Sequence, residues 1–599
     1  MLLLDDRFRL LKQGRRTALP RHRTLTAALD WSYELLPEKE RAILRGLSVF
    51  AGAFKLDAVS VVATGDRIAV PEAIEGTASL IAKSLVSADV SGDIAQYRLL
   101  DTTRAYALQK LTETGEHAAF LRLHAEYHRD LLQLAEVEWE TRPTDDWLAD
   151  YRRRINDVRS ALDWAFSAGG DVSIGVALTV AALPLWLHLS LMDECRICAE
   201  RALAGEPSER LRSECDDMKL YAALAAALLY ARGPIPETDV VWSKALQGAE
   251  NLANGEYQLR ALWGLSAHRI AVGDYRDGLR LAERFCAVAS EHGDTAARLN
   301  GSRMIGAALH YIGDQGNARQ HLDRVVTHYV APAQRSHVTR FLFDQSSLAR
   351  GTLSNVLWLQ GYPDQAVQMA QRALNGARAL DHVLSLCSVL VHSVCTIAIY
   401  VGDLTAAEHF LAQLQDHLAK HTLSVWNTLA RCLRGMLLIE RGDIAGLSLL
   451  RSSLGELREV RFVTRYPAYL GVLAQALGVH GNAMEARNVI DEAVAWADTH
   501  DERWCMPELL RIRGKLLQGD SSTAAAAEEQ YIRALEDARE QQALSWELRA
   551  ATDLAWLWHQ HGRSEAANEL LSSTYSRFTE GFETRDHRIA RALIERARS

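Results

Sequence analysis

The sequence predicts an all-α protein in which a small winged-helix domain is followed by a right-handed α-solenoid of tetratricopeptide-like helical hairpins. The first observation is a glycine that recurs about every 40 residues through the C-terminal two-thirds of the chain. The second is a series of helical patterns in residues 25–113 that ends in two short strand-like segments. The third is length, because 599 residues exceed the roughly 250–300 that one hydrophobic core can organise.

The winged-helix domain is expected at residues 25–113. LTAALDWSYELL and PEKERAILRGLSVF predict two amphipathic helices separated by Pro37, LDAVSVVA predicts a third, and VPEAIEGTASLIAKSLV predicts a fourth with Pro71 in its first turn. SADV and AQYRLL predict a β-hairpin that closes at Gly92, and DTTRAYALQKL returns to a helix. Helices followed by a small hairpin are typical of a winged helix.

The solenoid is expected at residues 116–599, with each recurring glycine between a Leu-rich or aromatic helix and an Ala-rich helix, as in VGDLTAAEHFLAQL. Glycine readily adopts the left-handed conformation that ends many helices, and the Asp, Asn or Ser that follows can cap the next helix. Small residues near the start of the second helices would let helices pack closely. These are Ala318, Ala366, Ala407 and Ala566.

The period is longer than the about 34 residues of a strict tetratricopeptide repeat, so the hairpins are tetratricopeptide-like. Hairpins of this kind need neighbours to bury their faces, and stacking them forms a concave surface that the first helix of each hairpin should line. Ser190 takes the equivalent position one repeat before the first glycine. The predicted structural turns are Gly233, Gly273, Gly313, Gly361, Gly402, Gly442, Gly481, Gly519 and Gly562.

Composition argues against a general affinity for nucleic acid or for an anionic membrane. The formal charge is only −9 over the whole chain. The N-terminus meets charge at Asp5 before a signal-peptide core could form, so a cytoplasmic protein is expected. Val172 to Met192 is interpreted as the one uncharged stretch long enough to span a bilayer, and Pro184 and His188 favour a buried hairpin there. No membrane partner is expected.

Two parts of the chain resemble a known family. Three N-terminal segments resemble the part that follows the nucleotide-binding core in bacterial signalling ATPases of the STAND class. They are RRTALPRHRTLTAALDWSYELLPEKERAILRGLSVFAGAF, LIAKSLV and YRLLDTTRAYALQKL. These are relatives of the NB-ARC ATPases, and many are transcriptional regulators. Three C-terminal segments resemble the end of the same regulators: ERWCMPELLRIRGKLL, ALSWELRAATDLAWLWHQHGR and YSRFTEGFETRDHRIARALI. The resemblance implies that residues 1–24 are the end of an ATPase module or a linker.

The sequence departs from that family at its nucleotide site. In the family a P-loop domain before the winged helix binds ATP or ADP, but this chain contains no G-x-x-x-x-G-K-[ST] motif to cradle phosphates. The family's Met-His-Asp nucleotide sensor corresponds here to Leu99, Leu100 and Asp101, so the histidine is replaced by Leu100. We therefore expect no nucleotide cofactor and a degenerate sensor at Leu100 and Asp101, with Asp101 capping the following helix.

Three other groups of residues suggest chemistry less strongly. Cys195 and Cys198 form a C-x-x-C without a second pair, and they lie in a helical pattern, which favours buried cysteines over zinc or redox chemistry. His124 and His128 share one helix face, but no third ligand stands at a matching spacing, so no metal is assigned. An aromatic group is expected to close the last hairpins: Trp546, Trp556, Trp558, Tyr575, Phe578 and Phe582.

Two functions remain, neither of them enzymatic, because no nucleophilic or acid–base signature is present. One is a scaffold of a bacterial signalling and transcription system that binds a protein partner or a small effector in the solenoid groove, with a separate ATPase chain as a further candidate partner. The alternative is a DNA-binding regulator. The predicted fourth helix, Val70 to Leu85, carries Glu72 and Glu75 against Lys83, which disfavours DNA reading. A basic run in residues 1–24 could contact nucleic acid or belong to the ATPase module, which we favour.

Overall fold

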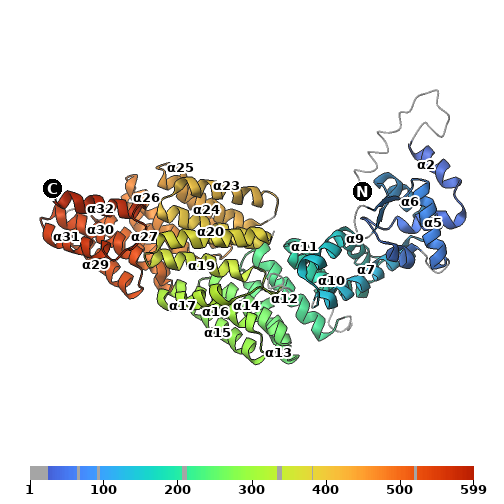
Figure 1. Cartoon of the computed structure of the whole chain (residues 1–599), viewed down its shortest axis with the longest axis horizontal. Coiled ribbons are helices and arrows are strands. Elements are labelled where there is room, and N and C mark those ends of the chain that lie inside the picture. Colours follow the sequence, from blue (N-terminus) through green and yellow to red (C-terminus); the bar gives the residue numbers. More distant parts are fainter. Residues whose placement is uncertain are drawn as a thin grey trace, which may run out of the picture. The chain divides into compact units, whose positions relative to one another are not determined.

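The computed structural model describes residues 25–63, 68–90, 95–139, 141–204, 212–332, 340–380, 382–421, 423–518 and 523–598. Within these ranges the chain is almost entirely helical, with one small β-hairpin (Figure 1). Residues 1–24, the hairpin turn at Gly92 and the repeat position Gly519 lie outside the described residues. Two compact units are present: Met1–Leu185 with Ile197–Asp216, and Trp186–Arg196 with Asp217–Ser599.

The first unit begins with the expected winged-helix arrangement. β1 and β2 pair antiparallel, with Ala88 opposite Tyr97, and Phe54 adds a bridge to Tyr97 on the far side of β2. Ile43, Leu44 and Phe50 are fully or almost fully buried in the core beneath the helices. The elements are α2 (Leu25–Glu34), α3 (Glu38–Leu47), α4 (Leu56–Ala58), a π-helical segment (Val59–Ala63), α5 (Val70–Ala82), β1 (Ser87–Asp89), β2 (Gln96–Arg98) and α6 (Asp101–Glu113).

The first helices of the predicted array pack onto this domain and belong to the same compact unit, so the units do not divide at residues 113–116. The physical reason is that a side chain of α9 is buried against the winged-helix domain. The carboxylate of Asp157 accepts the N–H groups of Ala51 and Gly52 there. The helices that follow α6 are α7 (His117–Trp139), α8 (Thr144–Tyr151), a 3-10 turn (Arg152–Arg154), α9 (Ile155–Ala165), α10 (Val172–His188) and α11 (Met192–Leu203).

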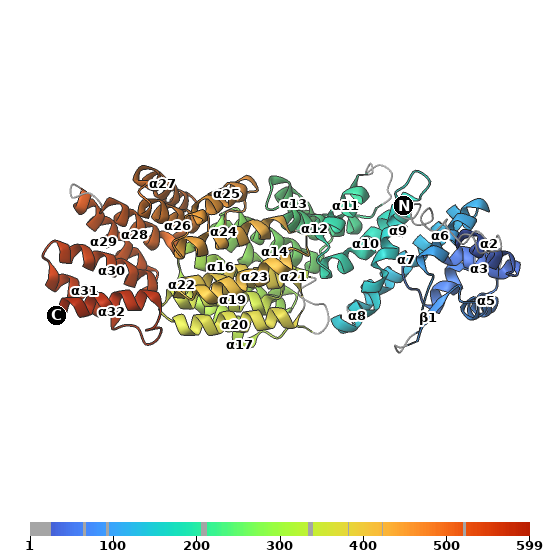
Figure 2. The same cartoon turned by 90° about the horizontal axis from the view of Figure 1, so that it is seen from above.

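The second unit is the α-solenoid, built from two-helix hairpins that are each completed by their neighbours (Figure 2). Its helices are α12 (Glu214–Ala231), α13 (Pro236–Asn251), α14 (Gly255–Ala271), α15 (Tyr275–Glu291), α16 (Thr295–Ile312), α17 (Gln315–His328), α19 (Gln345–Leu359), α20 (Pro363–Ala379), α21 (Val383–Val389), a π-helical segment (Leu390–Val394), α22 (Cys395–Val401), α23 (Leu404–Leu418), α24 (Ser424–Glu440), α25 (Ala445–Glu459), α26 (Tyr466–Val479), α27 (Ala483–Thr499), a 3-10 turn (Arg503–Cys505), α28 (Met506–Leu517), α29 (Ala524–Glu540), α30 (Leu544–Gln560), α31 (Ser564–Tyr575) and α32 (Arg585–Arg598).

The turns between paired helices follow the sequence pattern. All eight recurring glycines that are described have φ between 74° and 98°, and Ser190 has φ 56°. Asp403 caps α23 by accepting the N–H of Ala406 at 2.9 Å, and Asp274 and Asp314 cap their helices in the same way. Asn482 precedes α27 in the same way, but its side chain makes no capping hydrogen bond.

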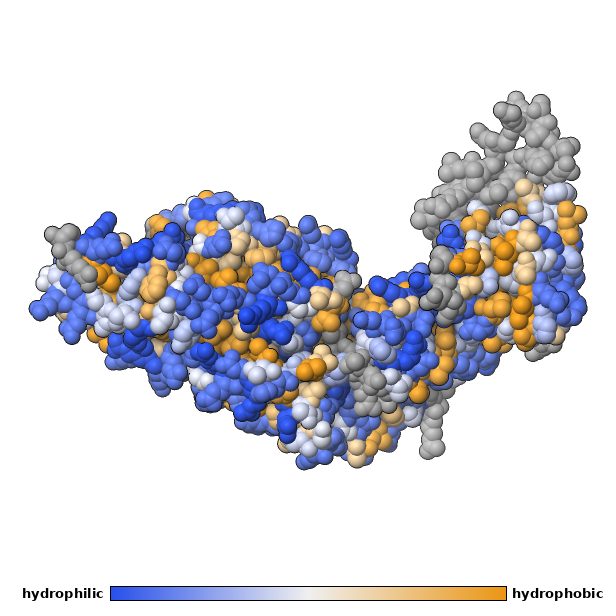
Figure 3. Space-filling model, in the orientation of Figure 1, coloured by the Kyte–Doolittle hydropathy of each residue, from blue (hydrophilic) through white to orange (hydrophobic). Residues whose placement is uncertain are grey.

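The close-packing alanines are buried as expected at Ala318, Ala366 and Ala407. In the last full hairpin the expectation was one residue off, because Ala567 is fully buried and Ala566 is only half-buried. The outer face of the solenoid is mostly hydrophilic in the view of Figure 3, with apolar residues gathered in bands.

Successive superhelical turns of the solenoid pack directly against one another. The N–H of Val463 donates to the carbonyl of Ala271 at 2.8 Å, and the hydroxyl of Thr464 donates to the carbonyl of Ile270 at 3.1 Å. A Cβ built on Gly313 would stand 2.9 Å from the Cβ of Arg503. The recurring glycines of the earlier hairpins therefore also allow close approach of the later turn, a role that their 40-residue spacing does not reveal.

The expectation that Val172 to Met192 is the one long uncharged stretch was wrong. α10 has 17 residues, whereas the continuous helical segment Val383–Val401 has 19, and it alone among the described residues is long and apolar enough to cross a membrane. Of its most apolar window, 83% is buried inside the protein, which is the burial expected of a core helix of the solenoid.

Candidate functional site

Two cavities among the described residues of the solenoid are lined by the first helices of its hairpins, as the sequence predicted for the inner face. The smaller has a volume of about 190 Å³ and is lined by α12, α14, α16, α19, α24 and the π-helical segment Leu390–Val394. The larger has a volume of about 400 Å³ and is lined by α22, α24, α26, α28, α30 and α32. Arg465 lines both. The close packing of successive turns makes these spaces the size of small-molecule sites.

Arg303 of α16 brings an unneutralised cation to the smaller cavity. Its side chain is only 9% exposed, and its Nε donates to Asn300 Oδ1 at 3.2 Å. Among the described residues, no carboxylate oxygen lies within 4.0 Å of the guanidinium. Burial lowers the pKa of Arg303 to about 10, so the group is still charged at neutral pH. A buried charge without a counter-charge is destabilising, which makes this residue a candidate binding group.

Arg465 adds a second buried cation at the boundary between the cavities. It lies just before α26 in a left-handed conformation with φ 67°. Its guanidinium donates to Asn355 Oδ1 at 2.6 Å and to Thr396 Oγ1 at 3.2 Å, both neutral acceptors, and its Cζ lies 4.9 Å from the ring centroid of Trp504. Its Nε has no hydrogen-bond partner among the described residues. The side-chain hydrogen bonds of both arginines therefore go to neutral acceptors, and the carboxyl group of Glu502, which accepts the backbone N–H of Arg465 at 3.2 Å, is close to Arg465 alone.

Aromatic side chains form the walls of the smaller cavity. Phe343 lies 5.2 Å from Tyr230, 6.2 Å from Trp263 and 6.4 Å from Trp426, measured between ring centroids. Two buried polar atoms of the wall, Trp263 Nε1 and His392 Nδ1, lack a hydrogen-bond partner among the described residues. Apolar walls with a few unpaired polar groups are typical of sites for small organic molecules.

His392 is neutral in this setting, because burial lowers its pKa to about 3. It therefore adds hydrogen-bonding capacity to the smaller cavity and no charge. The arrangement as a whole suits an anion with an aromatic or apolar body.

The larger cavity differs, because its charges neutralise one another. Glu508 accepts from Arg511 Nε at 2.7 Å and from Arg549 Nη1 at 3.0 Å, and Arg549 Nε donates to Asp586 Oδ2 at 2.7 Å. Burial opposes the ionisation of Glu508, but the two guanidinium groups prevail and lower its pKa to about 2. The charges of this network are therefore balanced among its own members, and one buried nitrogen, Arg549 Nη2, has no hydrogen-bond partner among the described residues.

The degenerate sensor position takes part in neither cavity. Leu100 is itself the residue before α6 and is 51% exposed. The expectation that Asp101 caps the helix was wrong, because Asp101 is the first helical residue and no side chain caps α6. Its carboxylate therefore contributes only through its place in the first turn, where a negative charge favours the helix dipole.

The aromatic residues expected to close the last hairpins do not form a single group. Trp546 is buried against Trp358 and Tyr400, at centroid distances of 4.7 and 5.9 Å. Tyr575, Phe578 and Phe582 instead surround His587. Trp556 is 44% exposed, and the indole N–H of Trp558 donates to Glu528 Oε1 at 2.8 Å. Helical spacing alone could not tell these neighbourhoods apart.

Sequence analysis missed the two arginines that distinguish the smaller cavity. A signal was present for Arg303, because GSRMIGAALHYI places one cation among small and apolar residues of an inner helix. No comparable signal marks Arg465, which lies in a loop between hairpins. Sequence analysis also missed that Asp157 of α9 lies beside His124 and His128 as a third potential metal ligand.

Comparison with known proteins identifies one domain of the chain. Residues 36–112 match a family model described as a winged helix-turn-helix domain. A Mycobacterium tuberculosis protein named "Putative HTH-type transcriptional regulator" is 32% identical over 275 residues, which cover 43% of this chain and 30% of the relative. An uncharacterised protein of the same species is 40% identical over 140 residues, which cover 22% of this chain and 34% of the relative. The matched part thus spans about a third of these relatives.

Among solved structures, the chain is similar to a Rap protein complexed with competence and sporulation factor, with 11% identity and a TM-score of 0.36 over 71% of this chain and 99% of that one. It is also similar to a STAND protein with a tetratricopeptide repeat sensor from Pyrococcus horikoshii, with 12% identity and a TM-score of 0.33 over 77% and 68% of the two chains. The family match and the α2–α6 arrangement together establish that residues 36–112 form a winged helix-turn-helix domain.

Proposed function

We propose that the chain is a non-catalytic, cytoplasmic regulatory scaffold of a bacterial signalling and transcription system, and that its solenoid binds a small organic anion. The observation that carries the proposal is Arg303, a buried cation in an aromatic-walled cavity where none of the described residues brings a carboxylate within 4.0 Å. The winged helix-turn-helix domain, and the similarity to a protein named as an HTH-type transcriptional regulator, support the regulatory setting.

The shape and charge of the smaller cavity define the class of ligand. About 190 Å³ holds roughly one aromatic ring with a short polar arm, since larger ligands occupy sites of about 300 Å³ or more. A carboxylate would satisfy Arg303, because a guanidinium binds carboxylates through two parallel hydrogen bonds. Trp263, Phe343 and Trp426 would cover the ring. An aromatic or branched aliphatic carboxylate meets all of these requirements.

Direct reading of DNA through the winged helix is less well supported. The helix before the wing, α5, has its nearby lysines engaged with acids. Lys83 contacts Glu40 at 2.5 Å, and Glu72 of α5 contacts Lys39 at 2.6 Å. The exposed face of α5 carries Glu75 and Ala78, neither of which attracts phosphate. We therefore propose that this domain transmits the state of the solenoid to a protein partner, for which a separate ATPase chain is one candidate.

Calorimetry on the full chain tests the ligand class. Phenylacetate and indole-3-acetate serve as anionic probes, and the corresponding amides serve as neutral probes of the same shape. We expect the acids to bind at least about tenfold more tightly than the amides, because only the acids can neutralise Arg303. Arg303→Met should abolish this preference, whereas the matched control Arg487→Met, on the exposed face of α27, should leave it intact.

Equal affinity for acids and amides would refute the ligand class, and so would unchanged binding of the acids in Arg303→Met. Retention of specific DNA by the full chain, lost on substitution within α5, would instead favour the DNA-binding alternative.

A further inference from the structure

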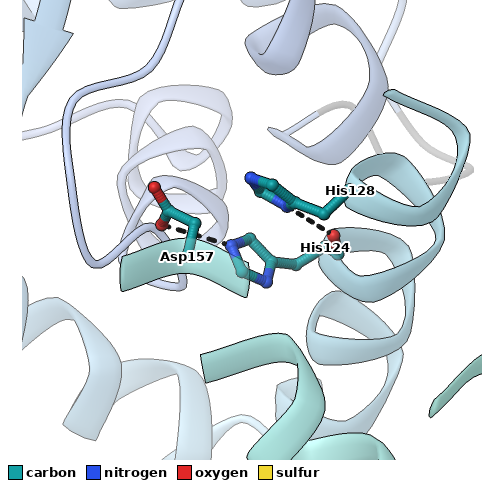
Figure 4. A group of neighbouring side chains, drawn as sticks. All are labelled: His124, His128 and Asp157. Atoms are coloured by element: carbon teal, nitrogen blue, oxygen red, sulfur yellow. Dashed lines mark hydrogen bonds and ion pairs between the residues drawn. The ribbon is translucent and has the colours of Figure 1, made fainter. Parts of the chain in front are cut away.

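His124, His128 and Asp157 meet in the interior of the first unit, although α7 and α9 contribute them from positions far apart in the sequence. All three side chains are fully buried. One nitrogen or oxygen from each lies within 4.8 Å of the others. Figure 4 shows the ring of His124 facing the carboxylate of Asp157, with the ring of His128 beside it. This cluster belongs to neither of the solenoid cavities.

The hydrogen bonds around His128 define its tautomer. Its Nδ1 lies 2.8 Å from the carbonyl oxygen of His124, and because that oxygen can only accept, Nδ1 must carry the proton. Nε2 of His128 therefore carries a free lone pair, and it has no partner among the described residues. A neutral imidazole whose other N–H donates to a backbone carbonyl is the usual state of a metal-ligating histidine.

Asp157 supplies a negative charge at the same place. Its Oδ1 accepts the N–H of Ala51 at 2.6 Å and that of Gly52 at 3.3 Å, and it lies 3.4 Å from Nε2 of His124. Asp157 is therefore a buried carboxyl group positioned by backbone N–H groups of the winged-helix domain.

A simple Asp–His hydrogen bond leaves much of this cluster unexplained. The contact between His124 and Asp157 is long at 3.4 Å, and three buried atoms remain without partners among the described residues: His124 Nδ1, His128 Nε2 and Asp157 Oδ2. Unpartnered buried polar atoms are rare in folded proteins, and three on neighbouring side chains require a cause. One ligand atom from each side chain lies within 4.8 Å of the others, and a shared tetrahedral zinc ion at about 2.0–2.1 Å from each would draw such atoms to about 3.3 Å apart.

We propose that His124, His128 and Asp157 bind one divalent transition-metal ion of the zinc class. Two imidazole nitrogens and one carboxylate oxygen form a three-ligand set that Zn²⁺ and Co²⁺ accept, with the fourth tetrahedral position left to water. The backbone N–H groups of Ala51 and Gly52 hold the carboxylate in place, as outer-shell groups do in metal sites. The ion would tie α7 and α9 to the loop after α3 and so fix the winged-helix domain to the helices that follow it.

Metal binding by the full, tag-free chain tests the proposal. The protein is stripped with a chelator, dialysed, and titrated with Zn²⁺ by calorimetry and with Co²⁺ by visible absorption, where tetrahedral Co²⁺ gives strong d–d bands. We expect about one ion per chain. Asp157→Asn and His128→Leu should each weaken Zn²⁺ binding at least about tenfold.

The matched control is the double variant His417→Leu/His421→Leu, which removes another pair of histidines four residues apart, one in the last turn of α23 and one just after it. His417 and His421 are not part of a three-ligand group among the described residues, so this variant should bind as the native chain does. Circular dichroism reports whether each variant keeps its helices. The proposal is overturned if the native chain shows no tetrahedral Co²⁺ spectrum, a result that requires no variant to fold. It is equally overturned if a folded Asp157→Asn binds Zn²⁺ with native affinity.

Discussion

Gly402 lies directly against Arg585 of the following superhelical turn: a Cβ built on Gly402 would stand 2.9 Å from the Cβ of Arg585. Gly481 has nearly the same left-handed conformation, with φ 83° against 86°, but nothing lies within 4 Å of the equivalent position. The two glycines therefore separate the conformational role of a repeat turn from its packing role.

This difference predicts unequal effects of the same substitution. Gly481→Ala should lower the free energy of unfolding by about 1–2 kcal/mol, the strain of alanine in a left-handed conformation. Gly402→Ala should lower it by about 1 kcal/mol more, because the added methyl group also displaces Arg585, and Gly402→Val should be worse again. Urea denaturation followed by circular dichroism measures both. Equal effects at the two positions would show that the turns do not pack tightly.

The buried charge network of the larger cavity should be sensitive to loss of one partner. Glu508→Gln would leave Arg511 and Arg549 with less counter-charge in the interior, and we expect it to destabilise the solenoid by about 3–5 kcal/mol. Glu485→Gln is the matched control, because Glu485 is exposed and its contact with Arg451 lies on the surface. That change should fall within about 0.5 kcal/mol of the native protein. Thermal unfolding distinguishes the two, and a mild effect at Glu508 would contradict the network.

Acid should destabilise the solenoid partly through His310. Burial lowers the pKa of His310 to about 3, whereas its pKa in the unfolded chain is about 6.5. Between these values the unfolded state binds more protons, so His310 stabilises the fold above pH 6.5 and this contribution is lost as the pH falls. The expected slope is up to about 1.4 kcal/mol per pH unit. His310→Gln should reduce the difference in urea midpoint between pH 7 and pH 5, and an unchanged difference would exclude His310 as a cause.

The chain should not bind ATP by itself. The sequence has no P-loop motif, and Leu100, in place of the family's sensor histidine, cannot hydrogen-bond a phosphate. Calorimetric titration with Mg·ATP and Mg·ADP should give no heat beyond dilution. Saturable binding at micromolar nucleotide would be the contrary result.

The sequence predicted those parts of the structure that depend on local pattern. The winged-helix elements follow from helical periodicity and the short hairpin, and the repeat turns follow from glycine spacing together with Asp caps such as Asp403. Contacts between distant residues could not be predicted in this way. Asp157 approaches His124 only because α9 folds back beneath the winged-helix domain. Arg465 reaches Asn355 only because one superhelical turn lies on another. A repeat period determines which face of each helix is buried, and it carries no information about the pitch of the superhelix.

The direct packing of one superhelical turn on the next changes how this array should fold. Most repeat proteins behave as one-dimensional chains whose units contact only their sequence neighbours, so that ends fray and segments melt separately. Here Tyr275 donates to Glu502 at 2.8 Å, and Val463 donates to Ala271, across 227 and 192 residues of sequence. Such long sequence separations slow folding, because a large loop must close before the contacts form. During synthesis on the ribosome, the turns around Gly273 and Gly313 stay uncovered until residues near 500 emerge, and we expect the solenoid to gain its full stability only then.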